Sequence, residues 1–440
     1  MVLGDLSSAE KGSAMTRHSG LVPAGTAFPV LSLLRSTGRM TRTELVERTG
    51  LTRKVVTQRL EELIRAGFAE EGEVGRSTGG RAPREVRFRA DGAHILVAEI
   101  AETSISVGLT DLAGTVVSEI RAELDPRSGP DVTLGRIESI FDSLIADRSA
   151  DSPSIYGIGI AIPGPVEISS GRPIGALSVP EWTDYPVRDR FVARYDLPVW
   201  VDNDANLMAL GELREGQARG LDDVLFVKVG GGIGGAVISS GTLQRGSQGS
   251  AGEFGHVLVS EDVAERCWCG HTGCLTQVSG ARAVGEFGQL AATTGESAIL
   301  AAISSQGRAI GAPEVFTAAA AGDPVSTDIL TRAGRTLGSV VSVLVSGLNP
   351  SLILFDAGLV SIDDPYMTAF RTTVRGRSLP SAVSEIQFAI STLGNSAGLT
   401  GAAYMVVDEL LSPSRLGLWS EHGSPVGLAD LIHRAAERAT

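Results

Sequence analysis

The chain contains 440 residues, of which 43% are hydrophobic and 20% are charged, and its formal net charge is −13. This length exceeds that of one ordinary compact domain, so we expect two or three domains with sizeable cores. The composition is typical of a globular protein. The first residues, MVLGDLSSAEKGS, do not pair a basic segment with an apolar one, so we expect no signal peptide and a cytoplasmic location.

Membrane and disulfide-rich classes are excluded by the sequence. The longest uncharged run, residues 336–355, is interrupted by Gly338, Gly347 and the Asn349-Pro350 pair. This pattern predicts a helix, a turn and a buried strand rather than a membrane span, so we expect no membrane partner. The cysteines number three, and an odd set does not suggest a disulfide framework.

Charge is distributed unevenly along the chain. Residues 1–27 are balanced, residues 28–91 carry 13 basic and 9 acidic side chains, and residues 92–440 carry a net charge of −17. An anionic partner is therefore expected for the front segment alone. We expect residues 1–27 to be disordered.

Residues 28–91 have the pattern of a winged helix-turn-helix domain. The apolar spacing of residues 28–37 predicts a first helix. The sequence TRTE at residues 41–44 is a capping box, which begins a second helix that runs to about Thr49. A tight turn is expected at Gly50, between the second helix and the third.

The third helix is the candidate recognition helix. Thr52 caps it, and Val56, Leu60 and Leu63 recur at the spacing of one buried face. The polar residues near its N-terminus lie away from that face, in the position from which a recognition helix contacts base edges. These candidate DNA-binding residues are Thr52, Arg53, Lys54, Thr57 and Gln58.

A basic wing follows this helix. Residues 68–71 and 85–88 are predicted to be short strands that flank a loop rich in glycine, serine and arginine. The loop supplies Arg76, Arg81 and Arg84, which can contact phosphates or a minor groove. The alternative is a small helical domain with a solvated basic linker. The order of cap, turn, recognition helix and wing favours double-stranded DNA as the partner.

From residue 92 the pattern changes to strands that alternate with helices. Three strands are expected within residues 94–124, and the segment YGIGIAIPGP is expected to be a buried strand that ends in a turn. Asp202–Asn206 lie where another strand runs into a helix, and the glycines of residues 230–235 lie between two strands. This alternation predicts an α/β fold with polar residues gathered at strand ends, where ligands bind.

All three cysteines lie in the sequence CWCGHTGC, at Cys267, Cys269 and Cys274. His256 supplies a fourth ligand in the spacing H-x10-C-x-C-x4-C, and three thiolates with one imidazole satisfy a structural tetrahedral zinc. We expect one zinc per chain. The alternative is a loop of free thiols beside an unrelated histidine. His271, inside the loop, is expected to be a bystander.

Seven motifs carry a resemblance to a known family. In order they are STGGRAP, GIGIAIPGP, VDNDAN, VGGGIGG, AGEFGH, CWCGHTGC and LGNSAGLTGAA, and the match spans residues 28–411. They resemble the ROK family of repressors and sugar kinases. The resemblance implies two actin/hexokinase-like lobes over residues 92–411, a sugar in the cleft and a zinc beside it. Members with a winged helix-turn-helix are mostly transcriptional regulators of carbohydrate use.

The resemblance leaves a choice between a regulator and a kinase. Kinases of the family carry an Asp-x-Gly-Gly-Thr turn that handles ATP phosphates, whereas this chain has Glu99–Thr103 there, with Glu102 adding negative charge. Asp204, which matches the catalytic base, is retained as a vestigial position. We therefore expect a repressor without enzymatic activity. The alternatives are a sugar kinase with a DNA-binding arm and a DNA-binding regulator whose cleft binds no ligand.

The resemblance also maps the effector site. The sugar-contacting positions match Asn203, Asp204, Glu253 and His256. The family's usual glutamate two residues after the last cysteine is replaced by Thr276, so we expect a sugar or sugar derivative of altered specificity. A symmetric dimer or tetramer that binds an inverted repeat is expected, because paired recognition helices need paired half-sites. Residues 412–440 are expected to form a helical tail on the body.

Overall fold

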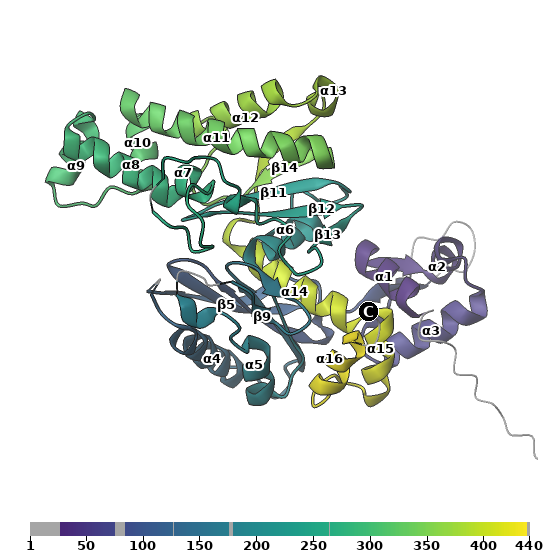
Figure 1. The fold of residues 1–440 in the computed structure, drawn as a ribbon. Coiled ribbons are helices and arrows are strands. Elements are labelled where there is room, and N and C mark those ends of the chain that lie inside the picture. Colours follow the sequence, from purple (N-terminus) through teal and green to yellow (C-terminus); the bar gives the residue numbers. More distant parts are fainter. Residues whose placement is uncertain (1–26, 75–83, 126, 176–178, 264, 438–440) are drawn as a thin grey trace, which may run out of the picture.

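The computed structural model describes residues 27–74, 84–125, 127–175, 179–263 and 265–437. Figure 1 shows a small N-terminal part beside two larger lobes, with helices α6 (Asp204–Glu215) and α14 (Ala397–Leu410) between the lobes. Among the described residues, no helix combines the length and the apolar composition needed to cross a membrane. The expected disorder of residues 1–27 lies outside the described residues, apart from Ala27, which begins the first helix.

The N-terminal part is a winged helix-turn-helix, as the sequence predicts. Thr41 and Glu44 form the expected capping box, and Gly50, at φ 66°, turns the chain between the second and third helices. Strand β1 was not predicted from the sequence, because three residues are too few to show an alternating pattern. It pairs with β3 in a sheet ordered β1-β3-β2. The elements are α1 (Ala27–Thr37), β1 (Arg39–Thr41), α2 (Arg42–Thr49), α3 (Arg53–Arg65), β2 (Ala69–Val74) and β3 (Arg84–Phe88).

The first lobe is a mixed five-stranded sheet ordered β10-β7-β4-β5-β6. The three predicted strands of residues 94–124 are present, and the predicted buried strand is β7, every residue of which is buried. Helices α4 and α5 cover one face of the sheet through Phe141 and Phe191. The elements are β4 (His94–Ile100), β5 (Ser104–Asp111), β6 (Val116–Glu123), α4 (Pro130–Ala146), β7 (Ile155–Ile162), β8 (Val166–Glu167), β9 (Arg172–Pro173), α5 (Val187–Tyr195) and β10 (Val199–Asn203).

The second lobe is built on a sheet ordered β13-β12-β11-β14-β15. Leu337, Phe355 and Phe370 belong to the core between this sheet and its outer helices. The uncharged run of residues 336–355 forms the end of α11, a turn and β14, as predicted. The elements are β11 (Val224–Val229), β12 (Ile233–Ser239), β13 (Thr242–Gln244), α7 (Thr276–Ser279), α8 (Ala281–Thr294), α9 (Ala298–Ser305), α10 (Ala312–Ala320), α11 (Pro324–Leu348), β14 (Leu352–Phe355), α12 (Pro365–Arg377), α13 (Pro380–Val383) and β15 (Gln387–Ile390).

The C-terminal helices join the body to the winged helix-turn-helix. Helices α15 (Pro413–Trp419) and α16 (Ala429–Glu437) follow α14. The Trp419 ring lies 5.4 Å from Phe68, at the end of the recognition-helix segment, and 5.6 Å from Tyr156 of β7. On α16, His433 Nε2 accepts a hydrogen bond from the backbone N–H of Val199, at the start of β10. A continuous apolar core therefore connects the winged helix-turn-helix, the first lobe and the C-terminal helices.

Candidate functional site

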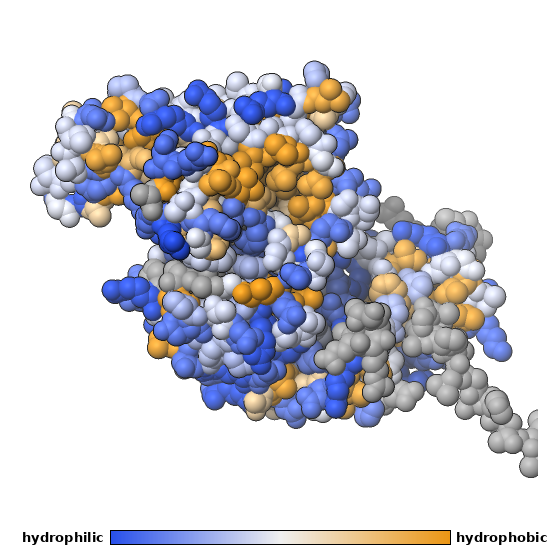
Figure 2. All heavy atoms as spheres, viewed as in Figure 1, coloured by the Kyte–Doolittle hydropathy of each residue, from blue (hydrophilic) through white to orange (hydrophobic). Residues whose placement is uncertain are grey.

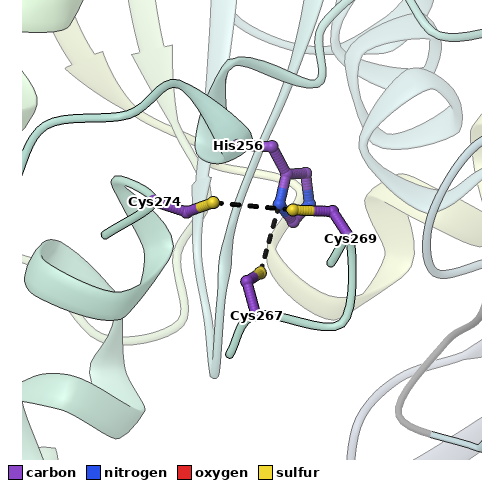
Figure 3. A group of neighbouring side chains, drawn as sticks. All are labelled: His256, Cys267, Cys269 and Cys274. Carbon is purple, nitrogen blue, oxygen red and sulfur yellow. Dashed lines mark hydrogen bonds between the residues drawn. The ribbon is translucent and has the colours of Figure 1, made fainter. Parts of the chain in front are cut away.

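The structure brings the predicted metal ligands together. The candidate ligand atoms of His256, Cys267, Cys269 and Cys274 all lie within 4.8 Å of one another (Figure 3). Cys267 Sγ is 3.4 Å from His256 Nδ1, and Cys269 Sγ is 3.5 Å from Cys274 Sγ. A tetrahedral zinc with bonds of about 2.0–2.3 Å needs ligands at this spacing. The four side chains therefore fit a zinc ion.

Backbone geometry holds the cysteine loop in this shape. Gly273 has a φ of 75°, and a methyl group on it would lie 1.6 Å from the carbonyl oxygen of Ser260, so the chain needs glycine there. Gln277 accepts a hydrogen bond from the Cys274 N–H and donates one to the Glu265 carbonyl. The protein backbone and Gln277 therefore hold Cys274 and its part of the loop in place.

His256 connects the metal cluster with the candidate effector site. Its Nδ1 faces the cysteines, and its Nε2 is 3.7 Å from Glu253 Oε2. Burial is the larger cause and the negative charge of Asp204 the smaller cause that raise the pKa of Glu253 to about 7. Glu253 and Asp204 are therefore close enough to interact electrostatically.

The strand–helix junction of β10 and α6 carries the other two predicted effector residues. Asn203 caps α6, because its Oδ1 accepts from the Asn206 N–H, and its Nδ2 donates to the Gly164 carbonyl. Asp204 is 4% exposed, and its Oδ1 accepts a hydrogen bond from the Ala205 N–H. The side chain of Asn203 is thus already engaged in structural hydrogen bonds, and Glu253, whose side chain is 22% exposed, is the more accessible polar group.

Two cations of the second lobe reach this junction, and neither was predicted from the sequence as a site residue. Lys228 of β11 forms an ion pair with Asp204 Oδ2, and Arg245 Nε is 2.7 Å from Asp202 Oδ2. Burial alone would lower the pKa of Lys228, but the charges of Asp204 and Glu99 outweigh burial and raise it. One sequence feature could have indicated a role for Lys228. It is a lysine inside an apolar strand, VLFVKV, in a chain that has only three lysines.

The turn between β4 and β5 lies against the glycine cluster. A methyl group on Gly231 would lie 1.8 Å from Glu102 Oε2, so the carboxylate of the first lobe contacts the glycine backbone of the second. Thr276, in place of the family glutamate, accepts a hydrogen bond from the Ile233 N–H through its Oγ1. Thr276 therefore stabilises the turn of the glycine cluster.

A cavity lies between the two lobes beside Lys228. Glu99 of β4 is 9% exposed there, and burial, as the largest cause, raises its pKa to about 7. The first-lobe side of the cavity consists of β4–β6 residues, and the second-lobe side includes the end of β14 and the loop before α14. The lining residues are Glu99, Ala101, Ser104, Ser106, Arg121, Met208, Lys228, Asp356, Ala357, Gly358, Gly394 and Asn395.

The candidate DNA interface is the N-terminal end of α3. Val56, Leu60 and Leu63 are buried, as predicted. The opposite side is accessible: Thr52, Arg53 and Lys54 are exposed, and Thr57 and Gln58 are half-buried. Thr52 Oγ1 accepts from the Val55 N–H, so this residue also caps the helix. Arg84 is exposed at the start of β3, whereas Arg76 and Arg81 lie outside the described residues.

Comparisons with known proteins agree with this arrangement. The ROK family model matches residues 97–409, and a model described as winged helix-turn-helix DNA-binding matches residues 27–70. The chain belongs to the ROK family.

Relatives of this ROK protein include both kinases and repressors. A glucokinase from Halalkalibacterium halodurans is 29% identical over 70% of this chain and 93% of its own. A xylose repressor from Caldicellulosiruptor bescii is 26% identical over 87% of this chain and 95% of its own. The crystal structure of a ROK family transcriptional regulator, a homolog of the E. coli MLC protein, covers 91% of this chain and 99% of its own with a TM-score of 0.77 at 23% identity. This likeness shows a shared fold.

Proposed function

We propose that this ROK protein is a DNA-binding transcriptional repressor of carbohydrate-related genes, controlled by a sugar or sugar-derived effector in the cleft between its lobes. The observation that carries the proposal is the exposed polar N-terminus of α3, presented by a winged helix-turn-helix on a sugar-kinase-like body. The length of the match to a xylose repressor, 87% of this chain, supports it. We propose a cytoplasmic location, because a bacterial-type repressor must reach the chromosome.

DNA recognition is assigned to the recognition helix and the wing. Arg53 and Lys54 are exposed cations at the end of α3 that enters a major groove in proteins of this architecture. Thr52, Thr57 and Gln58 lie on the same end of the helix, and Arg84 begins the wing strand. Arg76 and Arg81 are proposed as phosphate contacts from the sequence alone.

The effector is assigned to the polar groups around Asp204. Asp204 and Glu253 interact electrostatically, and His256 lies beside Glu253. Together with Asn203 they can accept and donate several hydrogen bonds, which suits a polyol. Thr276 braces the backbone instead of offering a carboxylate, so the effector differs from the sugars held by family members that keep the glutamate.

Zinc is proposed as the structural metal of the cysteine loop. His256, Cys267, Cys269 and Cys274 would hold it with no position left open, so the ion fixes the loop and does not activate water. Because His256 belongs to both groups, loss of the metal would also disturb the effector site.

Phosphoryl transfer is the second candidate function, because Asp204 and the glycine cluster of residues 230–235 are present. Two contacts argue against it. The Asp204 carboxylate is ion-paired with Lys228, so a substrate hydroxyl would have to displace the ammonium group to reach it. The Glu102 carboxylate lies against Gly231, where a phosphate would meet negative charge. We propose that the protein has no kinase activity.

We propose that the repressor is a homodimer or a dimer of dimers. An inverted-repeat operator presents two half-sites related by twofold symmetry, so two recognition helices must be presented together. Figure 2 shows apolar side chains gathered on the second lobe, around α11. The side chain of Val343 on α11 is 70% exposed, and Leu348 at its end is also exposed. These residues are the proposed contact with a second copy.

Footprinting on the DNA upstream of the protein's own gene tests this function against the kinase candidate. We expect two protected half-sites, with centres about one helical turn or a multiple of it apart. An ATP-coupled assay across hexoses, pentoses and N-acetylhexosamines should show no ADP release above background. Sugar-dependent ADP release without a footprint would assign the protein to the kinases.

A further inference from the structure

Helix α6 connects the candidate effector site with the winged helix-turn-helix. The helix begins at Asp204, which pairs with Lys228, and its last turn carries Arg214, which pairs with Asp408 of α14 at 2.8 Å. Twelve residues of α-helix span about 18 Å. One rigid element therefore has a cleft-side ion pair at its first residue and a second ion pair in its last turn.

The cleft end of α6 is held to the second lobe by two ion pairs, which we call the clasp. Its anions, Asp202 and Asp204, belong to the junction of β10 and α6. Its cations are Lys228, from β11, and Arg245, which follows β13. Asp202 lies in β10 of the first lobe, Asp204 directly follows this strand, and both cations come from the second lobe. The clasp therefore connects the two lobes at the place where an effector would contact Asp204.

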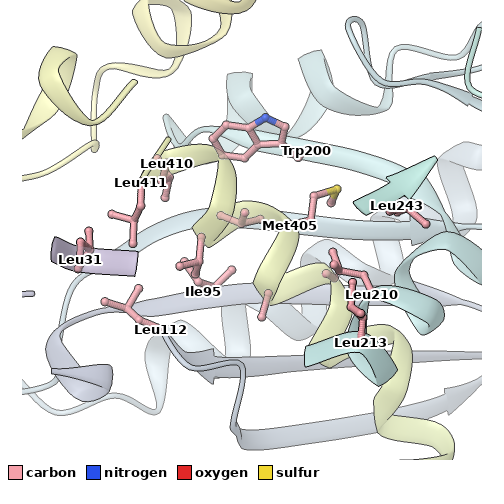
Figure 4. Packing of buried hydrophobic residues seen from close by; sticks show 14 of the residues in the cluster. Leu31, Ile95, Leu112, Trp200, Leu210, Leu213, Leu243, Met405, Leu410 and Leu411 are labelled. Carbon is pink, nitrogen blue, oxygen red and sulfur yellow. The ribbon is translucent and has the colours of Figure 1, made fainter. Parts of the chain in front are cut away.

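Helices α6 and α14 pack so closely that they must move together. A methyl group on Gly211 of α6 would lie 2.3 Å from the Ala397 carbonyl oxygen, and one on Gly401 of α14 would lie 1.7 Å from the Leu207 carbonyl oxygen. Figure 4 shows Leu210 and Leu213 of α6 near Met405 of α14 in the same core. Backbone contact of this kind leaves little freedom for one helix to slide on the other.

A buried carboxylate adds a second connection between these helices. Glu212 of α6 is fully buried and accepts hydrogen bonds from Ser391 Oγ and from the Leu393 N–H. Ser391 Oγ accepts in turn from the Gly394 N–H, in the loop that leads into α14. Gly394 also lines the cavity beside Lys228. The start of α14 is thus tied to the last turn of α6, while Gly394 itself reaches the cavity beside Lys228.

The far end of this helix pair meets the winged helix-turn-helix at a cluster that we call the joint. Asp408 of α14 accepts from Arg214 of α6 and, at 2.8 Å, from Arg35 of α1. The Arg35 guanidinium lies 5.8 Å from the centre of the Tyr404 ring, also on α14. Leu31 of α1 belongs to the core shared with α6 and α14. Asp408 is therefore a shared partner of the body and of the DNA-binding domain.

We propose that the α6–α14 pair transmits the state of the clasp to the winged helix-turn-helix through Asp408, so that opening of the clasp by an effector weakens DNA binding. An effector hydroxyl that donates to Asp204 competes with the Lys228 ammonium for the same carboxylate. Releasing that pair loosens the cleft end of a rigid body, which Arg245 and Asp202 still hold, and the other end of this body holds Arg35. A ligand shifts such an equilibrium by its differential affinity for the two states. This inference concerns the regulation of the proposed repressor and rests on that function.

A double-mutant cycle tests the coupling without any effector. Lys228→Met removes the ammonium of the clasp and keeps a similar stem, and Asp408→Asn keeps the shape of the joint and removes its charge. We expect Lys228→Met to weaken binding to the upstream DNA about fivefold or more in the wild-type background. In the Asp408→Asn background the same change should have an effect below about twofold, because the charged contact with Arg35 that transmits it is already lost.

Arg219→Gln is the matched control for the joint. Arg219 is exposed, follows α6 and pairs with Glu215 at 3.8 Å, without contact to Arg35 or Asp408. The Lys228→Met effect should be unchanged in this background. Arg245→Gln, which opens the other ion pair of the clasp, replaces Lys228→Met if thermal melting shows that the lysine variant does not fold.

The exchange rates of the backbone amide hydrogens in residues 27–37, which form α1, test the same coupling in the absence of DNA. Opening the clasp should raise exchange there in the wild-type background and leave it unchanged with Asp408→Asn. An equal effect of the clasp variant in both backgrounds, or no effect in the wild type, overturns the inference. Failure of the wild-type protein to bind DNA would instead overturn the proposed function, and the exchange result would still decide the coupling.

Discussion

Glu99 is a buried carboxyl group whose ionisation opposes folding. Burial raises its pKa to about 7 from an ordinary value near 4.5. Between these two values the folded protein binds more protons than the unfolded chain, so the free energy of unfolding falls as pH rises. The contribution of Glu99 is complete below pH about 4.5 and is lost as pH rises through about 7.

Glu99→Gln should flatten this pH dependence. The variant carries no ionisable group at the site, so its free energy of unfolding should fall less than that of the wild type between about pH 5 and 8, by an amount of order 2 kcal/mol. Urea denaturation at several pH values measures the difference. Glu119→Gln, on an exposed residue of β6, is the control and should keep the wild-type slope. Parallel curves for wild type and Glu99→Gln would contradict the assignment.

The cysteine cluster makes a prediction about metal content. Purified wild-type protein should contain about one zinc per chain by elemental analysis, and Cys269→Ser should lose it, because three ligands hold zinc far less well than four. His271→Ala is a matched control: the residue lies in the same loop, 3.6 Å from Cys269 Sγ, and is not one of the four clustered ligands. Native protein without zinc, or metal loss in both variants alike, would reject the proposed ligand set.

At the scale of elements, the recognition helix has two ends that should behave differently. Arg53 and Arg65 are both exposed, at the first and last positions of α3. Arg53→Ala should weaken binding to the operator by about 1–3 kcal/mol, as expected when a direct DNA contact is lost. Arg65→Ala, at the end directed away from the groove, should change little. Titration of labelled operator at fixed salt measures both, and equal losses would show that α3 does not dock by its N-terminus.

Some elements could be predicted from the sequence because local chemistry decides them. The capping box of Thr41 and Glu44 and the buried stripe of Val56, Leu60 and Leu63 are encoded within single helices, and the structure confirms both. The cysteine cluster was predictable for the same reason, since three of its ligands lie within eight residues. The structure brings His256 to them, although whether they hold zinc stays a prediction.

Contacts between distant segments could not be predicted in this way. The ion pairs of Lys228 with Asp204 and of Arg245 with Asp202 depend on how two sheets face each other, and nothing in the local sequence specifies that. The negative charge of Glu102 at the expected phosphate position was predicted from the sequence, but its contact with Gly231 between the lobes required the structure. The strand β1 was missed because its pairing with β3, not its own sequence, defines it.

At the scale of the whole molecule, a continuous core joins the winged helix-turn-helix to the body that carries the candidate effector site. Leu31 and Leu34 of α1 share one apolar cluster with Leu411 and Trp419 of the body. A DNA-binding domain on a flexible linker would not respond to ligand binding in the cleft. A domain packed against the body can be displaced when the helices that it contacts move. A repressor that responds to an effector in the cleft therefore requires the winged helix-turn-helix to stay packed against the body.

We also predict that no single substitution at Lys228 gives this protein kinase activity. Lys228→Met frees the Asp204 carboxylate, yet Glu102 still lies against Gly231 and Ala101 still fills a position that is glycine in the kinase turn. An ATP-coupled assay on Lys228→Met, with a neutral hexose panel, should therefore show no ADP release above background. Turnover in this single variant would mean that the clasp alone separates this protein from a kinase.

We expect the full chain to bind DNA and a sugar to release it. Fluorescence anisotropy of the labelled upstream DNA, titrated with protein and then with a panel of neutral pentoses, hexoses and N-acetylhexosamines, measures this directly. We predict saturable binding that weakens steeply with added salt, through counterion release, and that at least one sugar reverses. Binding that no sugar changes, or no binding at all, would contradict a sugar-controlled repressor.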